Sequence, residues 1–421
     1  MTRFSFERAM GALLLVLTVI LSLIMIRSPG TEDVTTFLYW TELVYQNGLV
    51  AGYSKIISDL HFFYPPLSAT ILYIARAFGK ALELSPLMSF KVTILTFQLL
   101  STGVILLLSS SYWVAAALNA SLLLSGVGLG YMDVCIAPFL ILAFWAFQSR
   151  RDVLGAALFL IACLIKWQPL ILIPFIGVYL FEISDLQSCL NVVRRPLFWH
   201  LVILVALTIA LLSWLFGLAP ARALRYAMSE GFLSGNALNV PWIAGYFYKL
   251  LFSSSFLMQN ELSPSWPTSI HLLPFRITFW VIFLVVVIRA MRVEKKFQYF
   301  LQFSIVGFLT YVMWNASVHE NHLFVPVILA YMLMLHEYTP ESRAITVVIT
   351  AMFNVNLFIF YGVTGTQLQS RVLGIDLSVI VAMLYVVAWL VLAAYAWRAA
   401  EPRKEAELSK KGTDLPAMVS D

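Results

Sequence analysis

Long apolar runs constrain this chain more than any other feature of its sequence. Residues 9–26 and 198–216 contain no Asp, Glu, Lys or Arg, and each run could cross roughly 30 Å of hydrocarbon as a helix. The chain of 421 residues is 61% hydrophobic and 12% charged, whereas soluble domains are about 45–50% apolar and about 25% charged. The composition predicts an all-α polytopic membrane protein. It excludes a secreted disulfide scaffold, a disordered protein and a nucleic-acid-binding domain.

The charged turns divide the chain into predicted membrane spans. Residues 66–84 are a further candidate, but this stretch carries Arg76, Lys80 and Glu83. If it does not cross, 16 of the 27 Lys and Arg residues lie in short segments on the side of the N-terminus, as the positive-inside rule requires. We therefore expect 66–84 to be an amphipathic helix on the outer face. The twelve predicted spans are 9–26, 88–109, 112–130, 134–149, 152–166, 167–182, 197–216, 272–290, 297–314, 320–336, 343–361 and 375–397.

This topology places both termini in the cytoplasm and predicts a multi-pass protein of the bacterial inner membrane. No small-residue cleavage site follows the first apolar run, so we expect a retained span and not a signal peptide. Residues 1–400 form a single transmembrane domain, and residues 401–421 form a cytoplasmic tail that we expect to be disordered.

Two long segments, 27–87 and 217–271, then lie on the outer face together with shorter turns, of which 315–322 is the most polar. Most of the unusual polar residues of the chain fall in these segments. Long outer loops with charged residues at membrane level are typical of a catalytic or binding cavity.

An acidic pair, Glu32 and Asp33, follows the first predicted span. The pair could supply a general base at the membrane surface. Alternatively, Asp33 could be the N-cap of a helix that begins near Val34. The same outer segment contains Tyr64-Pro65-Pro66-Leu67, whose two prolines direct the start of the next helix.

Polar residues also interrupt the predicted spans at two outer turns. Asp133 ends Gly130-Tyr131-Met132-Asp133, where an unpaired carboxylate between apolar helices is costly and indicates a functional role. Lys166 and Gln168 lie in Ile165-Lys166-Trp167-Gln168-Pro169, where two short spans meet. The lysine could extend to the aqueous surface, or it could bind a phosphate.

Two further stretches contribute candidate binding residues. Arg225, Asn239 and Trp242 lie in the second long outer segment. His319, Glu320 and His322 lie in the turn between two later spans, where polar residues stand directly before an apolar run. The imidazoles are expected to donate charge-assisted hydrogen bonds to a phosphate or a sugar hydroxyl.

No metal and no cofactor are expected. The two histidines are three residues apart, whereas the zincin pattern needs them at i and i+4 on one helical face. Cys135, Cys163 and Cys189 lie in or beside apolar runs without metal-ligand spacing, so all three are predicted to pack as small hydrophobic residues.

The order of these motifs resembles that of the GT-C superfamily of membrane glycosyltransferases, over residues 1 to about 340. The nearest patterns are those of dolichyl-phosphate-glucose-dependent glucosyltransferases and polyprenol-phosphate-mannose-dependent mannosyltransferases. The residue before Tyr64 is Phe63, where the glucosyltransferases carry an aspartate, so the resemblance leaves mannose and glucose open. The matching stretches are Glu32-Asp33, Tyr64-Pro65-Pro66-Leu67, Gly130-Tyr131-Met132-Asp133, Lys166-Trp167-Gln168-Pro169, Arg225 through Asn239 and Trp242, and Val318-His319-Glu320.

The resemblance implies a GT-C-like fold of about twelve transmembrane helices with juxtamembrane helices in the first outer loop. It implies an inverting transfer of a hexose from a polyprenyl-phosphate-linked donor to a hydroxyl of a glycolipid or glycan acceptor, on the non-cytoplasmic face and among membrane lipids. Asp33 would act as general base with Glu32 beside it. Tyr64, Asp133, Gln168, Asn239, Trp242 and Glu320 would bind substrate with the cationic candidates Lys166, Arg225, His319 and His322.

Two other functions are open on the sequence alone. A membrane transporter or flippase of lipid-linked sugars would also span the bilayer many times, but such proteins commonly contain internal repeats, which we do not find here. A polymerase or ligase of the O-antigen type would place its main motifs in a later outer loop. Trapping of a labelled sugar in a product, as opposed to its movement across a vesicle, distinguishes the transferase from the transporter.

Overall fold

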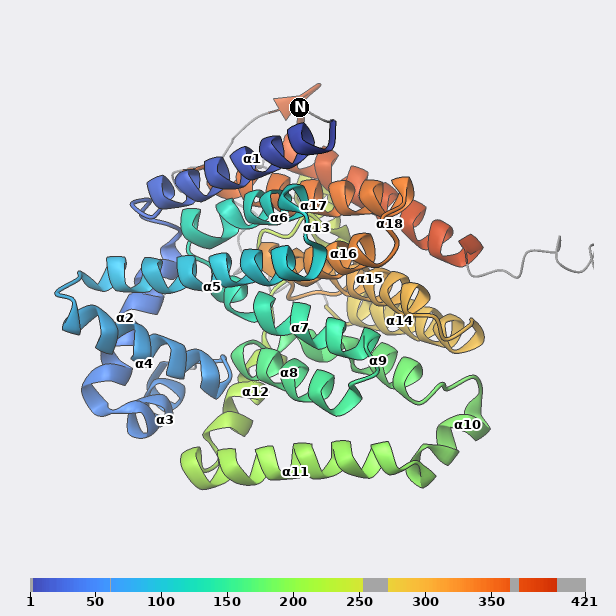
Figure 1. The fold of residues 1–421 in the computed structure, drawn as a ribbon, viewed down its shortest axis with the longest axis horizontal. Coiled ribbons are helices and arrows are strands. Elements are labelled where there is room, and N and C mark those ends of the chain that lie inside the picture. The colour runs from blue at the N-terminus through green and yellow to red at the C-terminus, as the bar shows by residue number, and fades with distance from the viewer. Residues whose placement is uncertain (1–2, 61, 253–271, 364–370, 400–421) are drawn as a thin grey trace, which may run out of the picture.

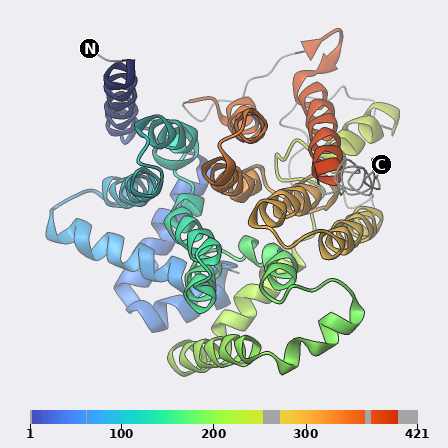
Figure 2. The same ribbon diagram turned by 45° about the vertical axis from the view of Figure 1, so that its right-hand side comes forward.

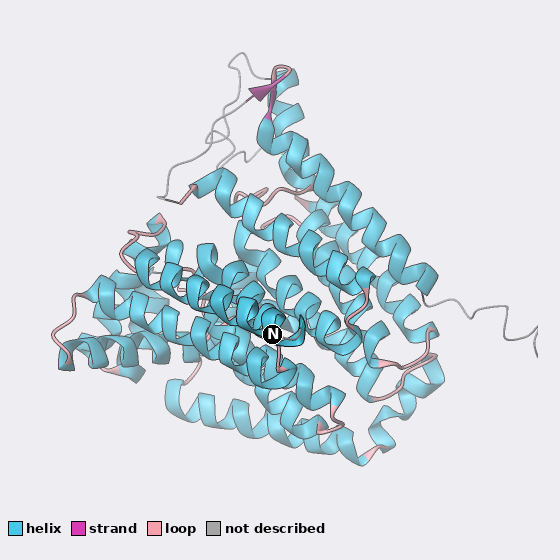
Figure 3. Ribbon diagram, turned by 45° about the horizontal axis from the view of Figure 1, so that its top comes forward, coloured by secondary structure: helices cyan, strands magenta, loops and turns pink. Residues whose placement is uncertain are grey.

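The computed structural model describes residues 3–60, 62–252, 272–363 and 371–399, which are almost entirely helical (Figure 3). The exception is one antiparallel hairpin of β1 (Arg371–Val372) and β2 (Ile375–Asp376). The α-helices are α1 (Arg3–Met25), α2 (Glu32–Asn47), α3 (Leu49–Leu60), α4 (Pro66–Ala81), α5 (Pro86–Ser109), α6 (Tyr112–Leu123), α7 (Ala137–Gln148), α8 (Asp152–Ile165), α9 (Ile173–Leu180), α10 (Leu186–Leu190), α11 (Pro196–Phe216), α12 (Ala219–Ser229), α13 (Val240–Phe252), α14 (Leu273–Arg292), α15 (Phe297–Trp314), α16 (Phe324–Glu337), α17 (Pro340–Tyr361) and α18 (Leu377–Ala399).

Within the described residues, six helices are long and apolar enough to cross a membrane: α1, α5, α11, α14, α17 and α18. Their exposed residues are largely Leu, Ile, Val and Trp, because hydrocarbon and not water is their solvent. The prediction of an all-α membrane protein is confirmed.

The chain breaks its helices at two polar turns. α8 ends at Ile165, and a 3-10 turn, η3 (Gln168–Leu172), precedes α9, so the expected break at Lys166 is present. α6 ends in a π-helical segment, η1 (Leu124–Gly128), in which Gly126 leaves helical geometry with φ −74° and ψ −105°. Gly130 follows with φ +80°, a left-handed conformation that favours glycine. Both breaks expose backbone groups that need partners.

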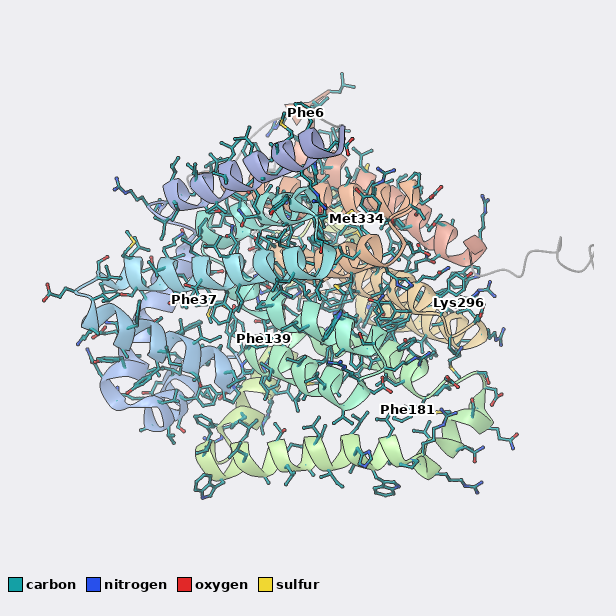
Figure 4. The ribbon with its side chains drawn as sticks, in the orientation of Figure 1. Phe6, Phe37, Phe139, Phe181, Lys296 and Met334 are labelled. Carbon is teal, nitrogen blue, oxygen red and sulfur yellow. The ribbon has the colours of Figure 1, made fainter. Side chains whose placement is uncertain are left out.

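The two ends of the bundle differ in structure. Helices α2, α3 and α4 lie together at the left in Figure 1, and α12 packs against α3. Figure 4 shows Phe37 of α2 near this end and Lys296, before α15, at the opposite end. Helix α11 lies along the lower edge of the molecule in Figure 1 and Figure 2, where it contacts α3, α8 and α12, and Phe216 is its one buried residue.

Residues 27–87, which were predicted to lie on the outer face, contain the three helices α2, α3 and α4. Phe37 and Val44 of α2 are buried, as are Ala69 and Leu72 of α4, whereas Ile74, Phe78 and Leu82 are exposed. Residues Pro66–Ala81 form a helix with one buried face, as predicted, and its position on the outer face stays a prediction.

Two expectations are wrong. Asp33 is not an N-cap, because α2 begins at Glu32 with Thr31 as its N-cap, and no side chain caps the helix. Cys189 is exposed, because it lies on the short helix α10 outside the bundle, whereas Cys135 and Cys163 are buried as predicted. The tail 401–421, and residues 253–271 of the second outer segment, lie outside the described residues.

Candidate active site

A cavity with two chambers lies at the α2–α4 end of the bundle. The large chamber has a volume of about 550 Å³, and its wall comes mainly from η3, α12, α14 and the turn after α15. The small chamber has a volume of about 90 Å³ and includes Asp33, Thr36 and Trp40 of α2. Six residues line both chambers and mark the boundary between them: Phe63, Tyr64, Lys166, Gln168, His319 and His322.

Asp33 reaches the small chamber from the first turn of α2. The N–H of Thr31 donates to the carbonyl of Leu129 over 3.1 Å, which fixes the start of this helix against the loop after η1. The Asp33 side chain is exposed to the chamber. Burial of the chamber within the protein raises the pKa of this carboxyl, and the positive charges of His319 and Lys166 offset only part of the rise. A carboxylate with a raised pKa is a stronger base than a free one.

Asp133 and Lys166 form a buried ion pair. The Nζ of Lys166 lies 2.5 Å from Oδ2 of Asp133, and Asn321 donates from Nδ2 to the same oxygen over 3.1 Å. The ammonium also lies 5.6 Å from the centre of the Tyr64 ring. Lys166 therefore reaches the cavity with its charge largely neutralised by a permanent partner.

His319 is positioned by the segment that follows α12. The N–H of Gly235 donates to the carbonyl of Val318, and the N–H of Glu320 donates back to the carbonyl of Gly235. This pairing brings Oε2 of Glu230 to 3.6 Å from Nε2 of His319. Burial by itself would lower the pKa of His319, but Glu230, Glu320 and Asp33 outweigh that effect, so the pKa is raised. The protonated form of His319 is therefore more stable at the chamber boundary than that of a free histidine.

Glu320 binds two tyrosines through its side chain. It accepts hydrogen bonds from the hydroxyls of Tyr131 and Tyr361, and Asn236 donates to the Tyr361 hydroxyl over 3.1 Å. Glu320 lines neither chamber. Glu320 therefore stabilises the protein around the cavity without lining it. The carboxylate that pairs with a histidine is Glu230.

His322 completes the boundary through an aromatic partner. Its Nδ1 lies 3.0 Å from the Tyr311 hydroxyl, and the two rings stack with their centroids 5.6 Å apart. Across the boundary, Trp167 donates from Nε1 to the carbonyl of Phe63 over 2.9 Å. These contacts fix the aromatic wall against which an uncharged substrate ring could pack.

Asp133 and Glu320 line neither chamber, and four further predicted site residues also lie outside the cavity lining. Glu32 is exposed and lines neither chamber. Arg225 is exposed on α12, which instead contributes Leu224, Ala227 and Met228 to the large chamber. Asn239 accepts from the backbone N–H of Trp242 and donates to the carbonyl of Val312, while the Trp242 indole donates to Ser378. Asn239 and Trp242 are both buried and bind parts of the protein itself.

The sequence reasoning missed Arg276 and Glu230. Arg276 lines the large chamber from the first turn of α14, where its Nη2 donates to the carbonyl of Glu230 over 2.7 Å. An arginine in the first turn of a strongly apolar helix was the available signal. Glu230 had no such signal, because its role depends on the pairing of residues 230–236 with the 315–320 turn.

Comparison with known proteins does not assign a family: no protein-family model matches the sequence, and a search of curated proteins finds no match. Among the described residues, no group of three or more His, Cys, Asp or Glu side chains has the arrangement of a metal site. The chemistry of the cavity must therefore be argued from its own side chains. The small chamber contains the Asp33 carboxylate, the boundary carries Lys166, His319 and His322, and the large chamber contains Glu230 and Arg276.

Proposed function

We propose that this protein is an inverting glycosyltransferase that moves mannose or glucose from a polyprenyl phosphate to a hydroxyl of a glycolipid or glycan. One observation carries the proposal. Asp33 opens into a small chamber that shares its boundary with a larger chamber containing Arg276 and His319. A base and phosphate-binding cations thus face one another across a space where a sugar could lie.

The proposed reaction is a single displacement. The acceptor oxygen forms a bond to the anomeric carbon while the bond from that carbon to the phosphate oxygen breaks. The hydroxyl proton passes to Asp33, which contributes about 10²–10⁴ in rate as a positioned base. The electron pair of the broken bond leaves with the lipid phosphate, whose added charge is stabilised by cations already in place.

Arg276 is a better phosphate ligand than Lys166. The Lys166 ammonium is already neutralised by Asp133 at 2.5 Å, whereas Arg276 donates to a backbone carbonyl and keeps other guanidinium N–H groups for a ligand. The large chamber also includes Trp280 and Met228, which are 62% and 75% exposed. These apolar rim residues suit a lipid chain that enters from the membrane.

The proposed topology has twelve spans with both termini in the cytoplasm, in a bacterial inner membrane. Six long helices support it, together with four shorter apolar segments at 112–128, 132–148, 152–165 and 168–180. Helices α15 and α16 bring the number to twelve. The cavity would then open on the non-cytoplasmic face, where polyprenyl-phosphate sugars are consumed without a nucleotide.

The test uses the purified protein in lipid vesicles. Polyprenyl-phosphate mannose and polyprenyl-phosphate glucose, each labelled in the sugar, are supplied separately with a cell glycolipid extract as acceptor. Transfer of label into a new glycolipid supports the proposal and identifies the sugar. Movement of intact labelled donor across the bilayer without a new product would instead establish the transporter or flippase.

A further inference from the structure

Lys91 is a fully buried lysine whose partners are backbone carbonyls. It lies in the second turn of α5 and is 0% exposed. Its Nζ donates to the carbonyl of Val127 over 2.7 Å and to that of Gly128 over 3.0 Å. Among the described residues no carboxylate forms an ion pair with it. A buried ammonium without a counter-ion is expensive, so a role for it is expected.

The broken end of α6 explains why these carbonyls need a donor. The π segment η1 ends at Gly128, after Gly126 has left helical geometry. Carbonyls at a helix end have no partner within the helix and carry the negative end of the helix dipole. The Lys91 ammonium satisfies two of them at once.

The positions of Asp33 and Asp133 both depend on this helix end. The carbonyl of Leu129 accepts the N–H of Thr31, which starts the helix that carries Asp33. The N–H of Tyr131 donates to the carbonyl of Ser125 over 2.9 Å, and Asp133 follows two residues later. One junction therefore sets the position of α2 and of the loop that leads to Asp133.

The packing at this junction leaves almost no free space. A Cβ added to Gly130 would lie 2.6 Å from Cγ2 of Val34 and 3.3 Å from Nζ of Lys91. A Cβ added to Gly30 would lie 2.7 Å from the carbonyl oxygen of Leu129. A shift of the Lys91 ammonium and of the carbonyls that it binds would therefore displace the first turn of α2.

We propose that Lys91 is a positioning residue that holds Asp33 and Asp133 in their relative geometry by clamping the carbonyls of Val127 and Gly128. This inference rests on the proposed function for its kinetic consequence, but its geometric part does not depend on that function. A displacement of about 1 Å in a reacting group can cost about 10²-fold in rate. Loss of the clamp should therefore lower turnover more than donor binding.

The kinetic test replaces Lys91 by Met, which keeps the length of the chain and removes the donor. We expect Lys91→Met to lower kcat about tenfold or more while KM for the donor changes less than about threefold. The acid limb of the pH profile should move to lower pH, because an Asp33 displaced toward water loses the burial that raises its pKa. Lys91→Gln, whose amide can donate to a carbonyl, should recover part of the loss.

A second measurement is independent of activity. In a Cys189→Ser background, which removes the exposed native thiol, Thr36→Cys reports on the small chamber and Met228→Cys on the large one. Lys91→Met should change the rate at which a membrane-impermeant maleimide labels Cys at 36 by about threefold or more, and should leave position 228 unchanged.

Asn354→Leu is the matched control. Asn354 donates to the carbonyl of Ser121, elsewhere on α6, and to the carbonyl of Thr350. It should alter stability without changing kcat or the labelling at position 36. If Lys91→Met leaves kcat, the pH profile and the labelling unchanged, Lys91 has no positioning role. If the labelling changes in a protein that transfers no sugar, the clamp stands and the proposed function fails.

Discussion

The Nζ of Lys166 lies 2.5 Å from Oδ2 of Asp133, and neither side chain is more than 7% exposed. The pair joins the break between α8 and η3 to the turn before α7. Loss of one partner from a buried ion pair leaves the other charge uncompensated and costs about 3–5 kcal/mol, whereas replacement of both is often nearly neutral. The main role of the pair is therefore structural: it holds together two segments beside the cavity.

Lys166→Met and Asp133→Asn should each lower the free energy of unfolding, and the double variant should lose less than the sum of the two. Thermal unfolding in detergent measures the three variants as a double-mutant cycle. The control is the pair of Glu42 and Arg76, whose atoms lie 2.7 Å apart between α2 and α4 and whose side chains are 33% and 12% exposed. Its loss should cost at most about 1 kcal/mol. Equal and additive effects of Lys166→Met and Asp133→Asn would show that the pair is not coupled.

Asp33→Asn should lower sugar transfer by about 10²-fold or more, because an amide cannot accept the hydroxyl proton. It should not destabilise the protein. Burial raises the pKa of Asp33, so the charged form is disfavoured in the fold, and Asn removes that charge. Rates from the vesicle assay and melting temperatures are measured together. Glu32→Gln is the control, since Glu32 lines neither chamber. Normal turnover of the Asp33→Asn enzyme would show that Asp33 is not the general base.

Arg276→Met should raise KM for the lipid-phosphate donor and lower kcat/KM by about tenfold to a hundredfold, since a charged hydrogen bond to phosphate contributes about 1.5–3 kcal/mol. Arg225→Met is the matched control, because Arg225 is exposed outside both chambers. Rates at donor concentrations below KM distinguish the two. A larger rise in KM for Arg225→Met than for Arg276→Met would show that the phosphate binds at α12.

The rate of transfer should depend on pH through Asp33 and His319. Asp33 must be ionised to accept a proton, so activity falls as pH drops through its raised pKa. His319 must be protonated to stabilise phosphate, so activity falls as pH rises through its pKa, which is also raised. The profile of kcat/KM is therefore bell-shaped, with both limbs above the ordinary values for Asp and His. His319→Gln should abolish the alkaline limb, and a limb that persists would belong to another group.

Asn239→Ala should cost about 1–2 kcal/mol of stability, because the Asn239 side chain caps the turn at Trp242 and binds the carbonyl of Val312. The turnover of the folded fraction should stay unchanged, since Asn239 lies outside both chambers. Unfolding midpoints and active-protein titration measure the two effects separately. A large rise in KM without loss of stability would show that Asn239 binds the substrate.

The sequence by itself determined where the helices run. Apolar length and the placement of Lys and Arg are local properties, so α11 and α15 were predicted to within a residue of their observed bounds. The same reasoning found the helix break at Lys166 and gathered Asp33, His319 and His322 as candidates, because polar residues at membrane level are costly wherever they occur.

Only the tertiary structure decided which of these groups meet. The sequence favoured Arg225, in the predicted outer segment, over Arg276, yet only Arg276 lines the cavity, because the direction of a helical side chain depends on how the helix is rotated against its neighbours. Glu230 pairs with His319, and Lys166 with Asp133, across 89 and 33 positions of the chain. Contacts of this kind follow from the packing of distant segments, which no local property of the sequence specifies.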